Sequence, residues 1–235
     1  MTATSLPAGR EKSVRVRSMF DAIAPRYDRV NRIISLGLDG HWRRRAVRAL
    51  ALAPGSAVLD LGCGTGALGV IARQFGYRVV GIDVSPGMLA ARSSRSAVAL
   101  GDAAALPFAT GSFDGVLCAY ALRNFTHLDA SLAEAARVVR PGGRVSLLEV
   151  ATPPHRLVRA GHSLWFRHVV PVIGAALSDR DAYRWLPDSV AYLPEEGELR
   201  ELLRRSGFAT VGCQLLQGGL SQIVTGTRTG APDGR

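Results

Sequence analysis

Apolar side chains recur at two different periods along the chain, and the change of period predicts where its elements lie. Through residues 11–53 the recurrence is helical and predicts three helices in succession. The first two would bury apolar faces running from Val14 to Ile23 and from Val30 to Ile34, and Asp39 would cap the third. In that third helix we expect the basic side chains to point outward; they are Arg43, Arg44, Arg45 and Arg48.

From residue 56 onward, short apolar runs alternate with amphipathic segments. The runs at 56–61, 77–83, 97–100, 113–119 and 145–150 predict buried strands, and the segments between them predict helices. Two further strands, Phe208–Leu216 and Leu220–Thr227, would form a hairpin at Gly218-Gly219. The expected fold class is α/β, with a seven-stranded sheet that is mostly parallel, an antiparallel edge hairpin and an N-terminal helical arm.

The same pattern divides the chain into parts. We expect a disordered tail at 1–10, a basic helical arm at 11–53, one α/β domain at 54–227 and a second disordered tail at 228–235. Within the domain, prolines and aromatic residues interrupt the alternation at 151–190. We interpret this segment as a helical insert that lies over the carboxyl end of the fifth strand.

Composition and charge narrow the class of protein. Hydrophobic residues make up 47% of the 235 residues, which is enough for one globular core. Three distant cysteines predict neither disulfides nor a zinc site, the five histidines have no metal-ligand spacing, and the expected location is a reducing cytoplasm. The net charge is +10, concentrated in residues 10–48. Such a surface suits nucleic acid, anionic lipid headgroups or solvent.

A glycine-rich turn follows the first predicted strand, which ends near Asp60. Its residues are Gly62, Gly64, Thr65 and Gly66. Glycine allows a ligand to approach the backbone closely, although a plain strand–helix connection is an alternative. Asp83 ends the next strand, 23 residues after Asp60, where nucleotide-binding βαβ units place an acid that accepts hydrogen bonds from both ribose hydroxyls. Because the turn has no Lys or Arg for a phosphate, we expect a ribose ligand without phosphate, such as S-adenosylmethionine (AdoMet).

Further motifs carry a resemblance to a known family. They are Met19–Asp28 with Phe-Asp and Tyr-Asp at its ends, Gly101–Phe108 with Gly-Asp-Ala and Leu-Pro-Phe, Ala121–Phe125 with Leu-Arg-Asn, and a looser match at Pro171–Ser189. Over about residues 16–227 the chain resembles the ubiquinone/menaquinone-biosynthesis C-methyltransferases. These are one branch of the Class I AdoMet-dependent methyltransferases, and the resemblance implies a Rossmann-like sheet with the arm folded over AdoMet as a lid.

The resemblance also implies a set of site residues. Those expected at AdoMet are Asp60, Gly62, Gly64, Thr65, Gly66, Asp83, Met88, Asp102, Ala103 and Ala119. Met88 fits the core of a short helix equally well. Those expected in catalysis are Arg123, Asn124 and Tyr27. Arg123 would stabilise a phenolate directly or through a water that Asn124 orients, unless it serves as a structural ion pair, and Tyr27 would come from the lid. No metal is expected.

The implied activity is C-methylation of a prenylated quinol of the demethylmenaquinol type in quinone biosynthesis. The ending Gly218–Gln222 departs from this branch, so C- or O-methylation of a soluble aromatic metabolite is an alternative. A nucleic-acid methyltransferase is a more distant one, because the basic arm lacks interleaved aromatic residues. The expected partners are a small aromatic substrate and, by peripheral contact, the inner face of an anionic membrane. No nucleic acid is expected as a partner. A homodimer and a monomer both fit the sequence.

Overall fold

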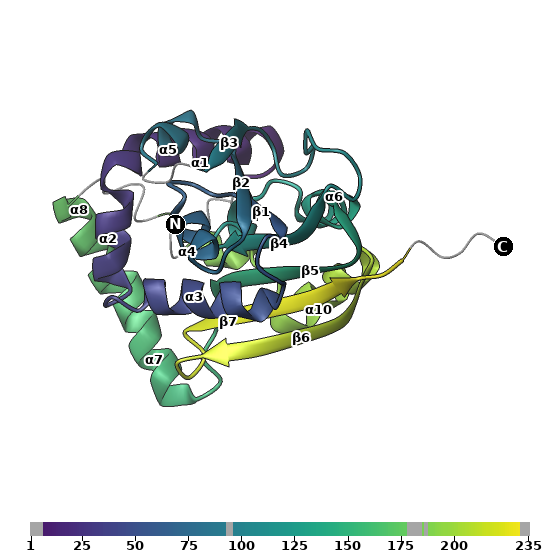
Figure 1. The fold of residues 1–235 in the computed structure, drawn as a ribbon. Coiled ribbons are helices and arrows are strands. Elements are labelled where there is room, and N and C mark those ends of the chain that lie inside the picture. The colour runs from purple at the N-terminus through teal and green to yellow at the C-terminus, as the bar shows by residue number, and fades with distance from the viewer. Residues whose placement is uncertain (1–6, 93–95, 178–184, 186–187, 231–235) are drawn as a thin grey trace.

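The computed structural model describes residues 7–92, 96–177, 185 and 188–230, and its described strands form one seven-stranded sheet (Figure 1). The strand order is β3-β2-β1-β4-β5-β7-β6; β7 runs antiparallel to β5 and β6, and the other adjacent pairs are parallel. The strands are β1 Ala57–Leu61, β2 Arg78–Asp83, β3 Ala97–Leu100, β4 Phe113–Ala119, β5 Val139–Val150, β6 Phe208–Leu216 and β7 Ser221–Arg228. The predicted fold class, with its edge hairpin, is confirmed.

Helices cover both faces of this sheet. On one face lie α3 Asp39–Leu50 and α4 Ala67–Gln74, whose buried side chains join Val58 and Leu117 of the strands. On the other lie α6 Leu128–Val138 and α10 Glu196–Arg205, which pack with Leu59 and Val145. The alternation of facing directions along a strand therefore supplies both cores. The short α5, Pro86–Ala90, contacts β2 and β3, and Ser85 caps it by accepting from the Met88 amide.

The N-terminal arm consists of α1 Gly9–Ile23, a 3₁₀ turn at Ala24–Arg26 and α2 Tyr27–Ile34. The helix α1 begins two residues earlier than expected, and its predicted face is wrong at Val14, which is exposed. The buried positions of α1 are Lys12, Val16 and Ile23, because the helix packs on α5 and on the loop after β4 instead of on the sheet.

Two expectations for α3 are also wrong. Asp39 makes no cap hydrogen bond; it accepts from Arg43 Nε at 2.8 and 2.9 Å instead. Arg43 is buried, whereas Arg44 and Arg48 are exposed as predicted. The reason is the ion pair, since a buried guanidinium needs a partner charge and Asp39 lies one helical turn before it.

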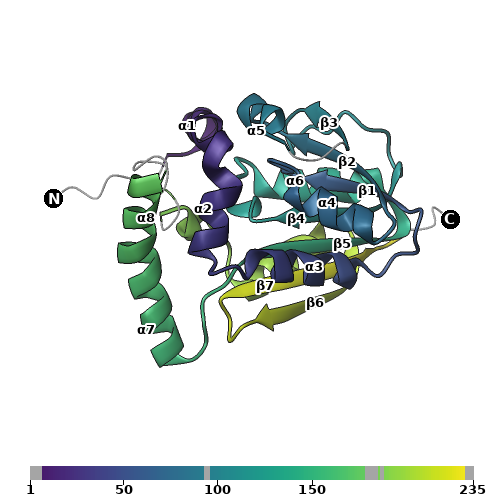
Figure 2. The same cartoon turned by 60° about the vertical axis from the view of Figure 1, so that its left-hand side comes forward.

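The insert after β5 forms an almost continuous helical column. It runs through α7 Arg156–Leu164, a π-helical segment at Trp165–Val169 and α8 Val170–Leu177. Figure 2 shows this column at the left, with α1 and α2 between it and the carboxyl edge of the sheet. The helix α2 packs on α8, and Val30, Met88 and Val170 belong to the apolar cluster that joins arm, sheet edge and column. Of the helices that the structure describes, none is both long and apolar enough to cross a membrane.

Candidate active site

Two neighbouring cavities lie at the carboxyl edge of the sheet. The first, here called the inner cavity, is bounded by the glycine turn after β1, the ends of β2 and β4, and α1. The second, the outer cavity, has a volume of about 390 Å³ and lies between the arm, the ends of β4 and β5, and the column α7–α8. Ligands of open α/β sheets bind at this edge, so the topology alone makes both cavities candidate sites.

The backbone of the glycine turn leaves room beside the inner cavity. Gly62 has φ +68°, and a Cβ there would lie 2.6 Å from Cβ of Ala121, so a larger residue would clash. Gly64 has φ +54°, and a Cβ built on it meets nothing within 4 Å. The open space and the left-handed backbone both explain why glycine is required where a ligand is to approach the chain.

Asp83 faces this turn from the end of β2. Its Oδ2 accepts from the Gly64 amide at 2.8 Å and its Oδ1 from the Ser85 amide at 2.9 Å. Burial raises the pKa of Asp83, and these amide hydrogen bonds oppose the rise. A carboxylate has about four acceptor positions, so Asp83 keeps acceptor capacity beside these amides. Two adjacent hydroxyls, such as those of a ribose, match that capacity.

The structure brings most of the predicted cofactor residues together. Those that line the inner cavity are Gly62, Gly64, Asp83, Met88, Asp102, Ala103 and Ala119. Asp102, which is expected to face the adenine, accepts through Oδ1 from the Ala104 amide at 2.9 Å. Met88 both lines this cavity and packs in the arm cluster, so its two interpretations are compatible. The donor and acceptor set therefore fits AdoMet.

Three other predicted cofactor residues do not line the cavity. Thr65 is buried and donates from Oγ1 to Asp28 Oδ1 of α2 at 2.7 Å. Gly66 precedes α4 in the left-handed conformation that starts this helix. Asp60 is buried beside Gly69, and burial raises its pKa to about 7. These residues shape the turn and join it to the arm.

The arm closes the inner cavity through polar contacts. Asp21 Oδ1 accepts from Ser85 Oγ at 2.6 Å and from the Gly87 amide at 2.8 Å. Lys12, missed by the sequence analysis, donates from Nζ to Phe125 O at 2.7 Å and lies 3.8 Å from the centre of the Tyr192 ring. In this closed arrangement the cavity holds about 80 Å³, whereas small-molecule sites have roughly 300–1,000 Å³. Side chains of α1 form one wall of this small cavity.

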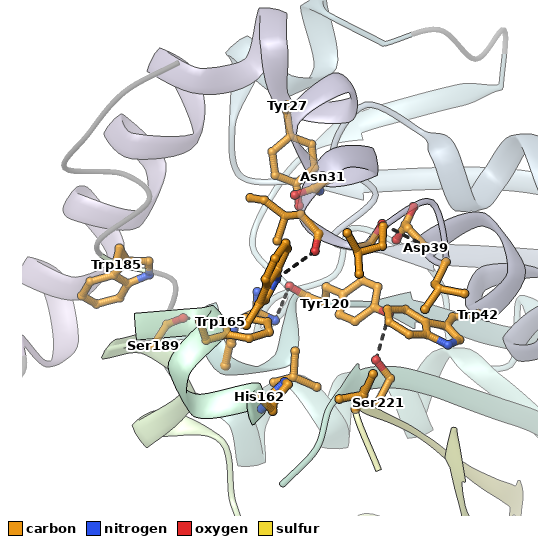
Figure 3. Close-up of a pocket in the computed structure, with 18 of the residues that line it drawn as sticks. Tyr27, Asn31, Asp39, Trp42, Tyr120, His162, Trp165, Trp185, Ser189 and Ser221 are labelled. Atoms are coloured by element: carbon orange, nitrogen blue, oxygen red, sulfur yellow. Dashed lines mark hydrogen bonds between the residues drawn. The ribbon is translucent and has the colours of Figure 1, made fainter. Parts of the chain in front are cut away.

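The outer cavity is lined mainly by aromatic and aliphatic side chains (Figure 3). Its aromatic residues are Phe20, Tyr27, Trp42, Tyr120, Trp165, Phe166 and Trp185. The indoles are anchored, since Trp165 Nε1 donates to Ile34 O at 3.2 Å and Trp185 Nε1 donates to Asn124 Oδ1 at 3.2 Å. A cavity of this size and character suits a large apolar ring system.

Arg123 and Asn124, both predicted as catalytic, line this outer cavity. They belong to the 3₁₀ turn Leu122–Asn124 directly after β4. Arg123 is buried; its Nη1 pairs with Glu149 Oε1 and donates to Tyr120 O at 3.1 Å, and its Nε donates to Ser189 Oγ at 3.1 Å. Arg123 thus forms the ion pair that a structural role predicts, and it also lines the cavity, as a catalytic role requires.

Four residues line both cavities and so form the wall between them: Phe20, Tyr27, Tyr120 and Asn124. Burial raises the pKa of Tyr27, while the charge of Arg43 and a hydrogen bond with Asn31 oppose the rise. Two phenols and an amide therefore stand where a methyl group would pass from one cavity to the other. This shared wall is the feature that makes the pair of cavities a candidate transfer site.

Tyr120, like Phe20, is a residue of this wall that sequence reasoning did not assign to the site. Its φ is +60°, which is rare for an aromatic residue and marks strain of a kind found at functional sites. Its hydroxyl lies 3.2 Å from Ser221 Oγ of β7, and the Arg43 guanidinium lies 5.5 Å from its ring centre. The available signal was its position immediately after Ala119, at the end of a central strand.

His162 of α7 is a second missed residue, and it lines the outer cavity beside Phe166, with ring centres 4.5 Å apart. Burial lowers the pKa of His162, so the imidazole is neutral near pH 7. His127, which is close to Arg123 in sequence, is exposed and precedes α6. Among the described residues, no three His, Cys, Asp or Glu side chains are grouped to hold a metal ion.

Comparisons with known proteins agree with this architecture. A ubiquinone/menaquinone biosynthesis C-methyltransferase from Geobacter sulfurreducens is 38% identical over 230 residues, covering 93% of this chain and 90% of that protein. A demethylmenaquinone methyltransferase from Deinococcus radiodurans is 43% identical over 224 residues, covering 89% of this chain and 92% of that protein. A crystal structure of a SAM-dependent methyltransferase from Thermotoga maritima shares the fold, with TM-score 0.66 and 19% identity over 91% of this chain and 100% of that one. Because the model of the ubiE/COQ5 methyltransferase family matches residues 9–228, the chain belongs to that family.

Proposed function

We propose that this AdoMet-dependent methyltransferase methylates a ring carbon of a prenylated quinol, of the demethylmenaquinol type, in quinone biosynthesis. The observation that carries the proposal is the pair of cavities with a shared wall, one with a ribose-compatible carboxylate and one large and apolar. The relatives at 38% and 43% identity, named for ubiquinone/menaquinone and demethylmenaquinone methylation, support the same acceptor class.

In this proposal the inner cavity binds AdoMet, which supplies an activated methyl group. Asp83 accepts from the ribose hydroxyls, Asp102 from the adenine amino group, and the Ala103 amide faces a ring nitrogen. Gly62 and Gly64 leave the backbone open to the methionine end, beside the small Ala119. Met88 packs on the adenine, while Asp60, Thr65 and Gly66 hold the turn in shape.

The acceptor occupies the outer cavity with its ring against the shared wall. Arg123 stabilises the phenolate form of a ring hydroxyl, which makes the neighbouring ring carbon a better nucleophile. Asn124 accepts from Trp185 through Oδ1, so a water or ligand would meet its amide NH₂ as a donor. Tyr27 and Tyr120 flank the opening between the cavities, and they hold the methyl donor and the methyl acceptor in line. Alignment of this kind is the main contribution required, since the methyl group is already activated.

The proposal includes contact with an anionic membrane, because a prenylated quinol is held in lipid. The net charge of +10 supports it. Arg43 of α3 takes no part in this contact, because it is buried against Asp39.

The deciding experiment compares demethylmenaquinol with a panel of aromatic polyketides, using the full chain and AdoMet. We expect methylated quinol, with kcat/KM roughly tenfold or more above any member of the panel, because only the apolar acceptor fills the outer cavity. Mass spectrometry counts the methyl groups, and NMR of the product distinguishes a C-methyl from an O-methyl group. Turnover of a polyketide with none of the quinol contradicts the proposed acceptor.

A further inference from the structure

The column α7–α8 has two faces with different surroundings. Its inner face supplies His162, Trp165 and Phe166 to the outer cavity. The column also exposes large apolar side chains: Leu157 is 78% exposed, Leu164 63% and Val172 68%.

These three exposed residues form one stripe. They are spaced seven and eight residues apart, which is close to two turns of an α-helix. The second interval includes the wider π-helical segment Trp165–Val169, and eight residues then again correspond to about two turns. The stripe therefore runs along the length of the column seen at the left of Figure 2.

The charge of this column has a single sign. Residues 151–177 contain three arginines and no acid, and the three arginines, Arg156, Arg159 and Arg167, are all exposed. A second copy of the chain docked on the same face would bring like charges together. An anionic lipid surface, in contrast, pairs with the arginines while its acyl region accepts the leucines and valine, as it does for interfacial amphipathic helices.

The mouth of the outer cavity lies beside this column. Leu36, in the turn between α2 and α3, and Val158 of α7 both line the cavity, yet they are 71% and 40% exposed. The cavity therefore reaches the surface between that turn and α7. A tail leaving the cavity here passes next to the apolar stripe.

We propose that the outer side of α7–α8, with the stripe Leu157, Leu164 and Val172 and the arginines Arg156, Arg159 and Arg167, docks on an anionic lipid surface and holds the mouth of the outer cavity against it. This docking surface adds a route of substrate delivery to the proposed function, and the inference rests on that function because it requires an acceptor held in lipid. The docking surface is distinct from the arginines of α3, because that helix covers a face of the sheet.

The test is sedimentation of the full chain with vesicles of phosphatidylcholine alone, or of equal parts phosphatidylcholine and phosphatidylglycerol. We expect binding only with phosphatidylglycerol, weakening with salt. The variant Arg156→Gln/Arg159→Gln/Arg167→Gln should bind about 100-fold more weakly, about fivefold for each charge. The variant Leu157→Ser/Leu164→Ser/Val172→Ser should also lose binding, although its charge is unchanged.

The matched control is Arg44→Gln/Arg45→Gln/Arg48→Gln, which removes the same charge from α3 and should bind like the wild type. Unchanged melting temperature and AdoMet affinity verify that each variant is folded. If the α3 variant loses binding and the two variants of the column α7–α8 keep it, or if the wild type does not bind, the docking surface is wrong. Vesicle binding is measured without acceptor, so docking without quinol turnover would refute the proposed function alone. Turnover of a short-tailed quinol without vesicle binding would refute docking alone.

Discussion

The inner and outer cavities share a wall but are assembled in different ways. The inner cavity is built mostly from residues that directly follow a strand, such as Gly62 after β1 and Asp83 at the end of β2. The outer cavity combines side chains from the arm, from α3, from the column α7–α8 and from β7, which are far apart in sequence. The first is thus a property of local strand–turn–helix units, and the second of how separate elements pack.

The difference has a chemical counterpart. A carboxylate and backbone amides line the inner cavity, and these fixed groups match one ligand with a fixed set of polar atoms. Anchored indoles and aliphatic side chains bound the outer cavity, and such walls select size and shape more than particular hydrogen bonds. Family members can therefore keep one cofactor while the outer cavity adapts to the acceptor.

The largest expected effect lies in the inner cavity. Asp83→Ala removes the acceptor for two hydroxyls, and hydrogen bonds to a charged group contribute about 1.5–3 kcal/mol each, so AdoMet affinity should fall roughly 10²–10⁴-fold. Isothermal titration calorimetry measures it. The control is Asp129→Ala, since Asp129 is exposed on α6. Equal loss of affinity in both variants would contradict a specific role for Asp83.

A second prediction concerns the outer cavity. Arg123→Ala should leave AdoMet affinity within about threefold while turnover falls roughly 10²–10³-fold, as for removal of other charge-stabilising donors. It also leaves Glu149 buried without its partner, which costs on the order of 3–5 kcal/mol of folding stability.

The double variant Arg123→Gln/Glu149→Gln separates these two effects. Because it removes both charges of the buried pair, we expect the melting temperature to recover while turnover remains low. If turnover recovers together with stability, Arg123 is structural only. If Arg123→Ala loses AdoMet binding in calorimetry, the division of labour between the cavities is wrong.

The smallest expected effect is a pH dependence of the folding stability, and it comes from Asp60 beneath the glycine turn. Burial raises the pKa of Asp60 to about 7 in the folded protein, while the unfolded value is about 3.9. The folded state therefore binds more protons between these values, and stability falls as pH rises through this window. Between pH 5 and 8 the loss should be about 1–3 kcal/mol, at about 1.4 kcal/mol per pKa unit. Urea unfolding should show this slope for the wild type and a flatter one for Asp60→Asn.

The contrast between the cavities also explains which sequence predictions succeeded. The carboxyl ends of the first five strands, the glycine turn and the hairpin at Gly218-Gly219 depend on neighbours in sequence, and the structure confirms them. The predicted start of the fifth strand at 145 was wrong, because β5 begins at Val139. The expectations for Val14, Asp39 and Arg43 were wrong. Helical periodicity says which residues share a face, but it does not say which face meets another element, and here the arm packs beside the sheet edge.

By itself, the sequence determined the alternating strands and helices, the open turn with Asp83 opposite it, and the resemblance that led to AdoMet, because these features depend on residue type at short and regular spacing. The tertiary structure alone decided that Tyr120 stands in the wall between two cavities, that Arg123 pairs with Glu149, and that the cavity mouth lies beside the arginines of α7. These relations join residues that are distant in sequence. Burial, ion pairing and packing bring them together, and no local spacing encodes which distant side chain will be the partner.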